Sequence, residues 1–201
     1  MSRTDLDTDL KQFLADLFAA IEPALNGPGQ NRVFSAGREA CVDARITGDL
    51  TGHRLPVCSC FDRAVRTASS HAGTAAVARS LAALESSLTW YDREDFSGTG
   101  SANFPSGHAN TFVVGPNGLT ERSGVWIGVS LLAPNVRYPD HSHPPEELYL
   151  VLSPGDFRNT DTDWQEPGVG GLFHNPPGIV HAMRSTDEPL LAVWTLVPAA
   201  V

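Results

Sequence analysis

The chain has 201 residues, of which 41% are hydrophobic and 18% charged, and its formal net charge at pH 7 is -9. These values fit one folded domain, or one domain with an appended subdomain, and argue against disorder. The acidic balance, with no basic run, argues against nucleic acid or an anionic membrane as partner and suits a cationic or zwitterionic small substrate.

No stretch of about eighteen apolar residues is present that could cross a membrane, and residues 1–10 lack the basic and apolar regions of a secretory signal. We therefore expect a cytoplasmic protein. Cys58 and Cys60 form a Cys-x-Cys pair, but Cys41 stands alone and no second pair completes a zinc site. We expect Cys58 and Cys60 to be ordinary helix residues.

The first half of the chain, residues 1–96, has the apolar period of helices. Apolar residues recur every three or four positions over residues 6–21, which predicts a first helix. Thr4 or Asp5 is a candidate cap, and the Pro- and Gly-containing stretch at 23–29 is expected to end the helix.

Two more helices are predicted in this half. One begins near Pro56, because proline suits the first turn of a helix, and the other covers residues 74–90. The Gly-rich segment between the first two helices has no clear period, and residues 97–110 have the composition of a loop.

After this loop the spacing of apolar residues changes from the period of helices to that of strands. The apolar runs are short and separated by Gly, Pro, Asn and Asp: residues 111–114, 125–132, 148–152, 171–173, 179–183 and 190–196. Many short strands at this spacing predict a β barrel or sandwich, and the lack of an internal repeat predicts one barrel. We expect a mainly β protein with a helical region at 1–96 packed on a barrel at 97–201.

The segment His141-Ser-His143-Pro-Pro-Glu-Glu147-Leu-Tyr149 carries the most specific chemistry. On a strand, residues two apart point to the same side, so His141 and His143 can both face a barrel interior. Glu147 and Tyr149 open the next strand with the same spacing. Two imidazoles, a carboxylate and a phenol aimed at one point suit a divalent first-row metal.

A second segment, residues 170–181, has Gly and Pro for a tight turn and ends in a third imidazole, His181. The two segments resemble the two motifs of the cupin superfamily, whose metal ligands map onto His141, His143, Glu147 and His181. The resemblance implies a cupin barrel, a double-stranded β-helix or jelly roll. Gly155 lies one residue later than in the first motif, and Ser185 stands in place of an Asn in the second.

Other candidates have a plainer interpretation. We interpret His108 and His174 as polar loop or strand residues and Glu146 as a solvated neighbour of Glu147. The three tryptophans of the barrel half are expected in its core or rim, although one of them could cover a cationic group: Trp126, Trp164 and Trp194.

The run from Tyr138 to Tyr149, with His181 after it, resembles the cupin-type dimethylsulfoniopropionate (DMSP) lyases of the Q type (DddQ). The resemblance implies a β-elimination that releases dimethyl sulfide and acrylate. It implies that Tyr149 is the base, that Tyr138 positions the substrate or tunes the base, and that the substrate is a small zwitterionic sulfonium compound. Zinc, iron(II) and manganese all suit the ligand set, and the ligand types do not choose among them.

Three alternatives stay open on the sequence. The chain could be an iron-dependent cupin dioxygenase acting on a small thiol or acid, a cupin that binds a small molecule without catalysis, or a lyase acting on another β-substituted acid. The helices could cover the barrel, close over its mouth or form a homodimer contact, and residues 97–110 could be a lid.

Overall fold

The structure is a computed structural model that describes residues 2–48 and 50–198. Its helices are α1 (Arg3–Ile21), α2 (Pro28–Ala40), α3 (Phe61–Ser69), α4 (Ala75–Leu84) and the short α5 (Phe104–Gly107), with 3-10 turns η1 (Glu22–Ala24), η2 (Pro56–Cys60) and η3 (Glu85–Ser87). Its strands are β1 (His108–Val114), β2 (Trp126–Leu132), β3 (Glu146–Val151), β4 (Asp156–Asn159), β5 (Leu172–Asn175), β6 (His181–Arg184) and β7 (Leu190–Val197). None of the helices in these ranges is long and apolar enough to cross a membrane.

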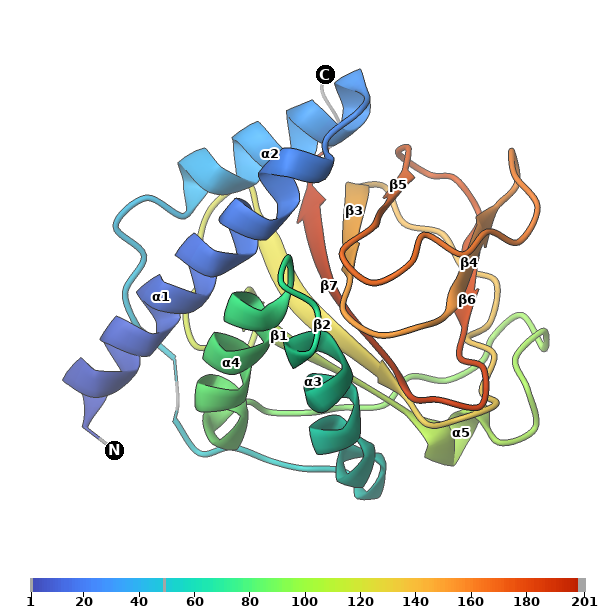
Figure 1. The fold of residues 1–201 in the computed structure, drawn as a ribbon, viewed down its shortest axis with the longest axis horizontal. Coiled ribbons are helices and arrows are strands. Elements are labelled where there is room, and N and C mark those ends of the chain that lie inside the picture. The colour runs from blue at the N-terminus through green and yellow to red at the C-terminus, as the bar shows by residue number, and fades with distance from the viewer. Residues whose placement is uncertain (1, 49, 199–201) are drawn as a thin grey trace.

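Two antiparallel sheets face each other in the second half of the chain. The larger has the strand order β1-β2-β7-β3-β5, and the smaller pairs β4 with β6. Figure 1 shows α1 to α4 on one side of the larger sheet and β4 and β6 on the other. The larger sheet is thus the middle layer of the molecule.

The central strands of the larger sheet are apolar runs because this sheet is covered on both faces. In β3, Leu148 and Leu150 belong to the core shared with the helices, whereas Tyr149 and Val151 belong to a second core inside the barrel. Successive side chains of a strand point to opposite faces, and here both faces are buried.

Helix α1 confirms the first predicted helix, but its cap differs from the expectation. The Ser2 hydroxyl accepts from the Asp5 backbone N–H at 3.2 Å, and the Asp5 carboxylate accepts from the Ser2 N–H at 3.0 Å. This is a capping box, in which the cap lies three residues before its acidic partner. Thr4 and Asp5 are therefore inside the helix, and Ser2 is the cap.

Helix α2 was not predicted, because its glycines mask the helical period. Packing overrides that low propensity: Val33, Phe34 and Gly37 are buried. A side chain at Gly37 would place its Cβ 3.0 Å from the Thr195 methyl, so glycine lets the helix approach β7 closely.

Two predicted boundaries also change. The helix expected at 74–90 ends at Leu84 and continues as η3, and the loop at 97–110 contains α5 and the start of β1. Strand β4 was missed because its alternating, polar sequence is short. Cys58 and Cys60 lie in η2, and the division at residue 96 stays a prediction.

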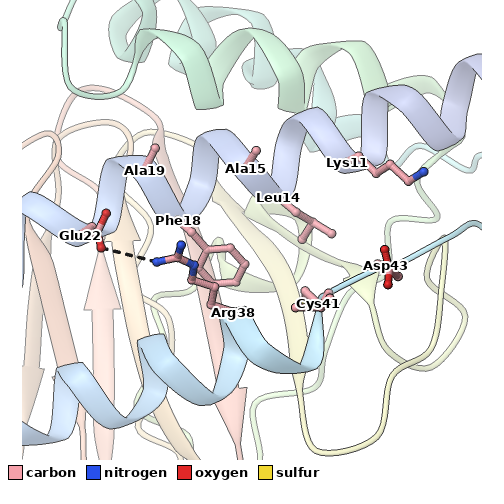
Figure 2. A pocket seen from close by; sticks show the side chains of 11 residues that line it. Lys11, Leu14, Ala15, Phe18, Ala19, Glu22, Arg38, Cys41 and Asp43 are labelled. Carbon is pink, nitrogen blue, oxygen red and sulfur yellow. Dashed lines mark hydrogen bonds and ion pairs between the residues drawn. The ribbon is translucent and has the colours of Figure 1, made fainter.

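A surface cavity of about 480 Å³ lies where α1 meets the end of α2. Figure 2 shows Leu14, Phe18 and Arg38 between the two helices and Cys41 near the end of α2. A dashed line joins Arg38 to Glu22, and this pair is 3.5 Å long. None of the candidate metal ligands lines this cavity.

Candidate metal centre and active site

Three imidazoles converge inside the barrel. His141 and His181 face each other across an isolated bridge with backbone hydrogen bonds of 3.1 and 2.9 Å, and His181 opens β6. His143 lies in the turn before β3, so the expectation that His141 and His143 share a strand is wrong. The two prolines that follow His143 interrupt pairing. The ligand atoms of the three histidines nevertheless lie within 4.8 Å of one another.

Each imidazole is oriented by a backbone carbonyl. The Nδ1 atoms of His141, His143 and His181 lie 2.9, 3.0 and 3.0 Å from the carbonyl oxygens of residues 139, 145 and 179. A carbonyl only accepts, so each Nδ1 must donate, which leaves each Nε2 with a free lone pair. This is the arrangement in which histidine binds a metal.

Glu147 is the carboxylate of this cluster. Its Oε2 lies 3.1 Å from Nε2 of His181 and 3.6 Å from Nε2 of His143. It also accepts a 2.9 Å hydrogen bond from Asn175, which faces it across the β3–β5 pair. Burial by itself would raise the pKa of Glu147, but His181 and His143 outweigh burial and hold that pKa well below its ordinary value.

The same surroundings shift the pKa values of two of the histidines. Burial and the neighbouring His181 lower the pKa of His141 to about 4, so its imidazole is neutral at neutral pH. Burial would also lower the pKa of His143, but Glu147 more than compensates and raises it.

The residues fit a metal ion. The Nε2 atom of His181 is buried and has no hydrogen-bond partner within the described residues, although the Glu147 oxygen faces it. Two acceptor atoms that face each other at this distance need a proton or a cation to satisfy both. A cluster of three histidines can supply that cation site.

Tyr138 and Tyr149 line the same cavity, which has a volume of about 250 Å³. Burial and then the Glu147 carboxylate raise the pKa of Tyr149 well above its ordinary value, so the phenol is protonated unless a cation is nearby. Burial also raises the pKa of Tyr138, against the effect of Arg93.

A chain of hydrogen bonds holds Tyr138. The Trp194 indole donates to Ser130 at 3.2 Å, Ser130 donates to Asn110 at 2.6 Å, and the Asn110 amide donates to the Tyr138 phenol oxygen at 3.3 Å. Arg93 lines the same cavity as Tyr138, and its positive charge favours the ionised phenol. Sequence reasoning identified none of these supporting polar residues, because no motif marks them.

Glu146 is not the solvated neighbour that the sequence suggested. It is 1% exposed, accepts from Arg32 at 2.7 and 2.5 Å, and lies 2.7 Å from Nε2 of His174. Glu146 is the residue directly before Glu147 on the strand, so it points to the opposite face, the helix side of β3. His174 is a residue of β5, as expected for a polar strand position.

The remaining candidates divide between core and rim. His108 is buried at the start of β1, Trp194 is buried in the barrel core, and Trp126 is 42% exposed at the cavity. Trp164 lies outside the cavity under three guanidinium groups: Arg137, Arg158 and Arg184.

Three imidazoles held within a fold of two antiparallel sheets define the class of protein: a mainly β fold with a candidate metal site at its centre. The sequence profile of the dimethylsulfoniopropionate lyases matches residues 30–192. The chain belongs to the DMSP lyase family.

Individual relatives are similar to the chain over part of their length. A putative DMSP lyase, DddL, from Cereibacter sphaeroides is 30% identical over 127 residues, which are 59% of this chain and 50% of the relative. The DMSP lyase DddQ from Ruegeria pomeroyi is 28% identical over 93 residues, 46% of each chain. The chain thus spans about half the length of the curated relatives it matches.

The crystal structure of DddQ from Ruegeria pomeroyi superposes with a TM-score of 0.72 over 96% of this chain and 93% of that one, at 20% identity. At this identity the likeness establishes the fold. Helices followed by antiparallel sheets are therefore shared along nearly the whole chain.

Proposed function

We propose that this chain is a metal-dependent DMSP lyase. The observation that carries the proposal is a cluster of three metal-type imidazoles, two of which line one small cavity together with Glu147 and a buried phenol, in a member of this family. We assign His141, His143, Glu147 and His181 as ligands of zinc, iron(II) or manganese. When bound, such a cation supplies positive charge that favours the phenolate of Tyr149 and stabilises negative charge on the substrate carboxylate.

Tyr149 is assigned as the base. Its phenolate oxygen takes the proton from the carbon next to the substrate carboxylate. The electron pair of the broken C–H bond becomes the second bond to the neighbouring carbon, and the C–S bond breaks. Dimethyl sulfide leaves as a neutral molecule, acrylate remains, and the Tyr149 phenol then returns its proton to solvent.

The other walls of the cavity suit a sulfonium compound. Phe112 packs edge-on against Trp194 and Trp126, with ring centroids 5.2 and 6.1 Å apart, and all three line the cavity. Aromatic faces attract cations, and a buried site strengthens the attraction. Tyr138, fixed by Asn110, is assigned to position the substrate.

The test is dimethyl sulfide measured by gas chromatography above protein loaded with zinc, iron(II) or manganese and mixed with DMSP. Tyr149→Phe should lower turnover by about 10²–10⁴-fold, because the base is lost while the ring keeps its contact with Phe157. Metal content and melting temperature should stay unchanged in this variant. His181→Ala should lose metal and activity together.

Two results would contradict the proposal. A fully active Tyr149→Phe would remove Tyr149 as the base. Absence of dimethyl sulfide across the three metals would remove the substrate assignment, and oxygen uptake with small thiols and acids would then test the dioxygenase alternative.

A further inference from the structure

Arg93 is a cation in the cavity without an acidic partner. It lines the cavity together with Tyr138, and among residues 2–48 and 50–198 it forms no ion pair. It is the one Arg or Lys of the described residues that line the cavity. We propose that Arg93 binds the substrate carboxylate and so selects a zwitterion over a simple sulfonium cation. This inference rests on the proposed lyase function.

The start of the Arg93 side chain is held in place. The Arg93 backbone N–H donates to Nε2 of His108 at 2.8 Å, and Nδ1 of His108 lies 2.5 Å from the Phe104 carbonyl oxygen. The His108 ring is 1% exposed and stacks on the Phe104 ring at 3.7 Å. A residue placed in this way loses less freedom on binding, which favours affinity.

The cavity contains groups that suit both charges of a zwitterion. Arg93 and Tyr138 offer hydrogen-bond donors for an anion, whereas Trp194, Trp126 and Phe112 offer ring faces for a cation. The planar fork of a guanidinium matches a carboxylate in two parallel hydrogen bonds. An anion also needs a local attraction in this chain, because its net charge is -9.

Binding at Arg93 would also serve the reaction. Negative charge moves toward the substrate carboxylate as the neighbouring carbon loses its proton, so a cation paired with that carboxylate stabilises the transition state. The same contact would hold the reacting carbon near Tyr149, which shares the cavity. Sequence reasoning had no means of finding Arg93, because it lies outside both cupin motifs.

The experiment compares Arg93→Gln and Arg93→Lys with wild type in the metal-loaded full chain. Arg66→Gln is the matched control, since Arg66 is exposed on α3 and lines no cavity of the barrel. Calorimetry measures binding of two probes, acrylate and trimethylsulfonium. Arg93→Gln should weaken acrylate binding roughly 10–100-fold and leave trimethylsulfonium binding unchanged. The acrylate affinity of Arg93→Lys should lie between those of wild type and Arg93→Gln, because lysine keeps the positive charge but lacks the planar fork of the guanidinium. With DMSP as substrate, Arg93→Gln should raise KM by a larger factor than it lowers kcat.

Two outcomes overturn the assignment. Unchanged acrylate affinity in a folded Arg93→Gln shows that Arg93 does not bind the anion. Equal weakening of both probes shows that Arg93 shapes the cavity through Tyr138 without contacting the carboxylate. If wild type binds acrylate through Arg93 but makes no dimethyl sulfide, the lyase proposal fails while the anion site stands.

Discussion

Each functional side chain at the centre of the barrel is fixed by a contact of its own. The imidazoles are held by backbone carbonyls, and Glu147 is held by the Asn175 amide at 2.9 Å. Partners of this kind set the orientation of metal ligands and tune their basicity. Residues that never touch the metal should therefore matter for its binding.

Asn175→Ala tests this expectation. The change removes the hydrogen bond to Glu147 at a buried position, so metal affinity should fall about 10–100-fold while the fold is retained. Competition with a chromogenic chelator measures the affinity. Asn31→Ala is the control, because Asn31 bonds only an exposed carbonyl on α2. Equal affinities in the two variants would contradict a role for Asn175.

Cys41 offers a test of burial at a single thiol. Burial raises the pKa of Cys41 to about 11, against the effect of Arg122, so the thiol is protonated at neutral pH. Since the thiolate is the nucleophile, alkylation of Cys41 should be slow at pH 7.5 and should accelerate as the pH rises toward 11. Mass spectrometry after iodoacetamide treatment should find the half-buried Cys60 labelled first. Rapid labelling of Cys41 would show that the α1–α2 cavity opens.

At the scale of elements, β3 connects the site to the helices. Glu147 and Tyr149 point into the barrel, and the preceding Glu146 points outward to Arg32 of α2 and His174 of β5. A one-residue shift of register would exchange these faces. The ion pair with α2 therefore helps to keep Glu147 and Tyr149 facing the candidate metal site.

Arg32→Ala should lower the free energy of unfolding by more than Arg38→Ala does, because buried Glu146 then keeps only His174 as a partner. Arg38→Ala on the same helix should cost under about 0.5 kcal/mol, since both partners of its 3.5 Å pair are exposed. Urea unfolding measures both values. Equal costs would contradict a special role for the buried pair.

The pH dependence of this pair has a defined sign. Burial would raise the pKa of Glu146, but Arg32 and His174 outweigh burial and lower it. A lowered pKa contributes stability above the ordinary value near 4.5, and that stability is lost as the pH falls through the folded value. The difference between wild type and Arg32→Ala should therefore shrink below about pH 4.

At the scale of the whole molecule, helices and sheet share one core. Phe13 and Leu17 of α1, Leu81 of α4 and Val129 of β2 belong to the same buried cluster. The three histidines of the candidate metal site lie on the other face of that sheet, beside Tyr138 of the second core. Binding at the site should therefore stabilise the whole fold.

Metal removal should lower the melting temperature. A ligand at a hundredfold excess over its Kd stabilises the folded state by about 2.7 kcal/mol, which in a chain of this size corresponds to roughly 5–10 °C. Scanning calorimetry of metal-loaded and chelator-treated protein measures the shift. His181→Ala should abolish the difference between the two samples. A wild-type protein with no shift would argue against a metal at this site.

The sequence by itself determined the class of fold and the residues at its centre. Local residue spacing is enough to recognise the helical and strand periods, the short strands and the two motifs. His141, His143, Glu147 and His181 could be named because their chemistry is packed into two short segments. Tyr149 followed because it lies two residues after Glu147.

Only the tertiary structure decided which distant residues support them. Arg93, Asn110 and Asn175 reach the site through chain pairing that no local pattern encodes. Helix α2 exists because Val33 and Phe34 find a core to enter, despite glycines that weaken the helical signal. Glu146 and Glu147 are identical in chemistry and adjacent in sequence. They are distinguished only by the faces of β3, because one face meets α2 and the other encloses the imidazoles.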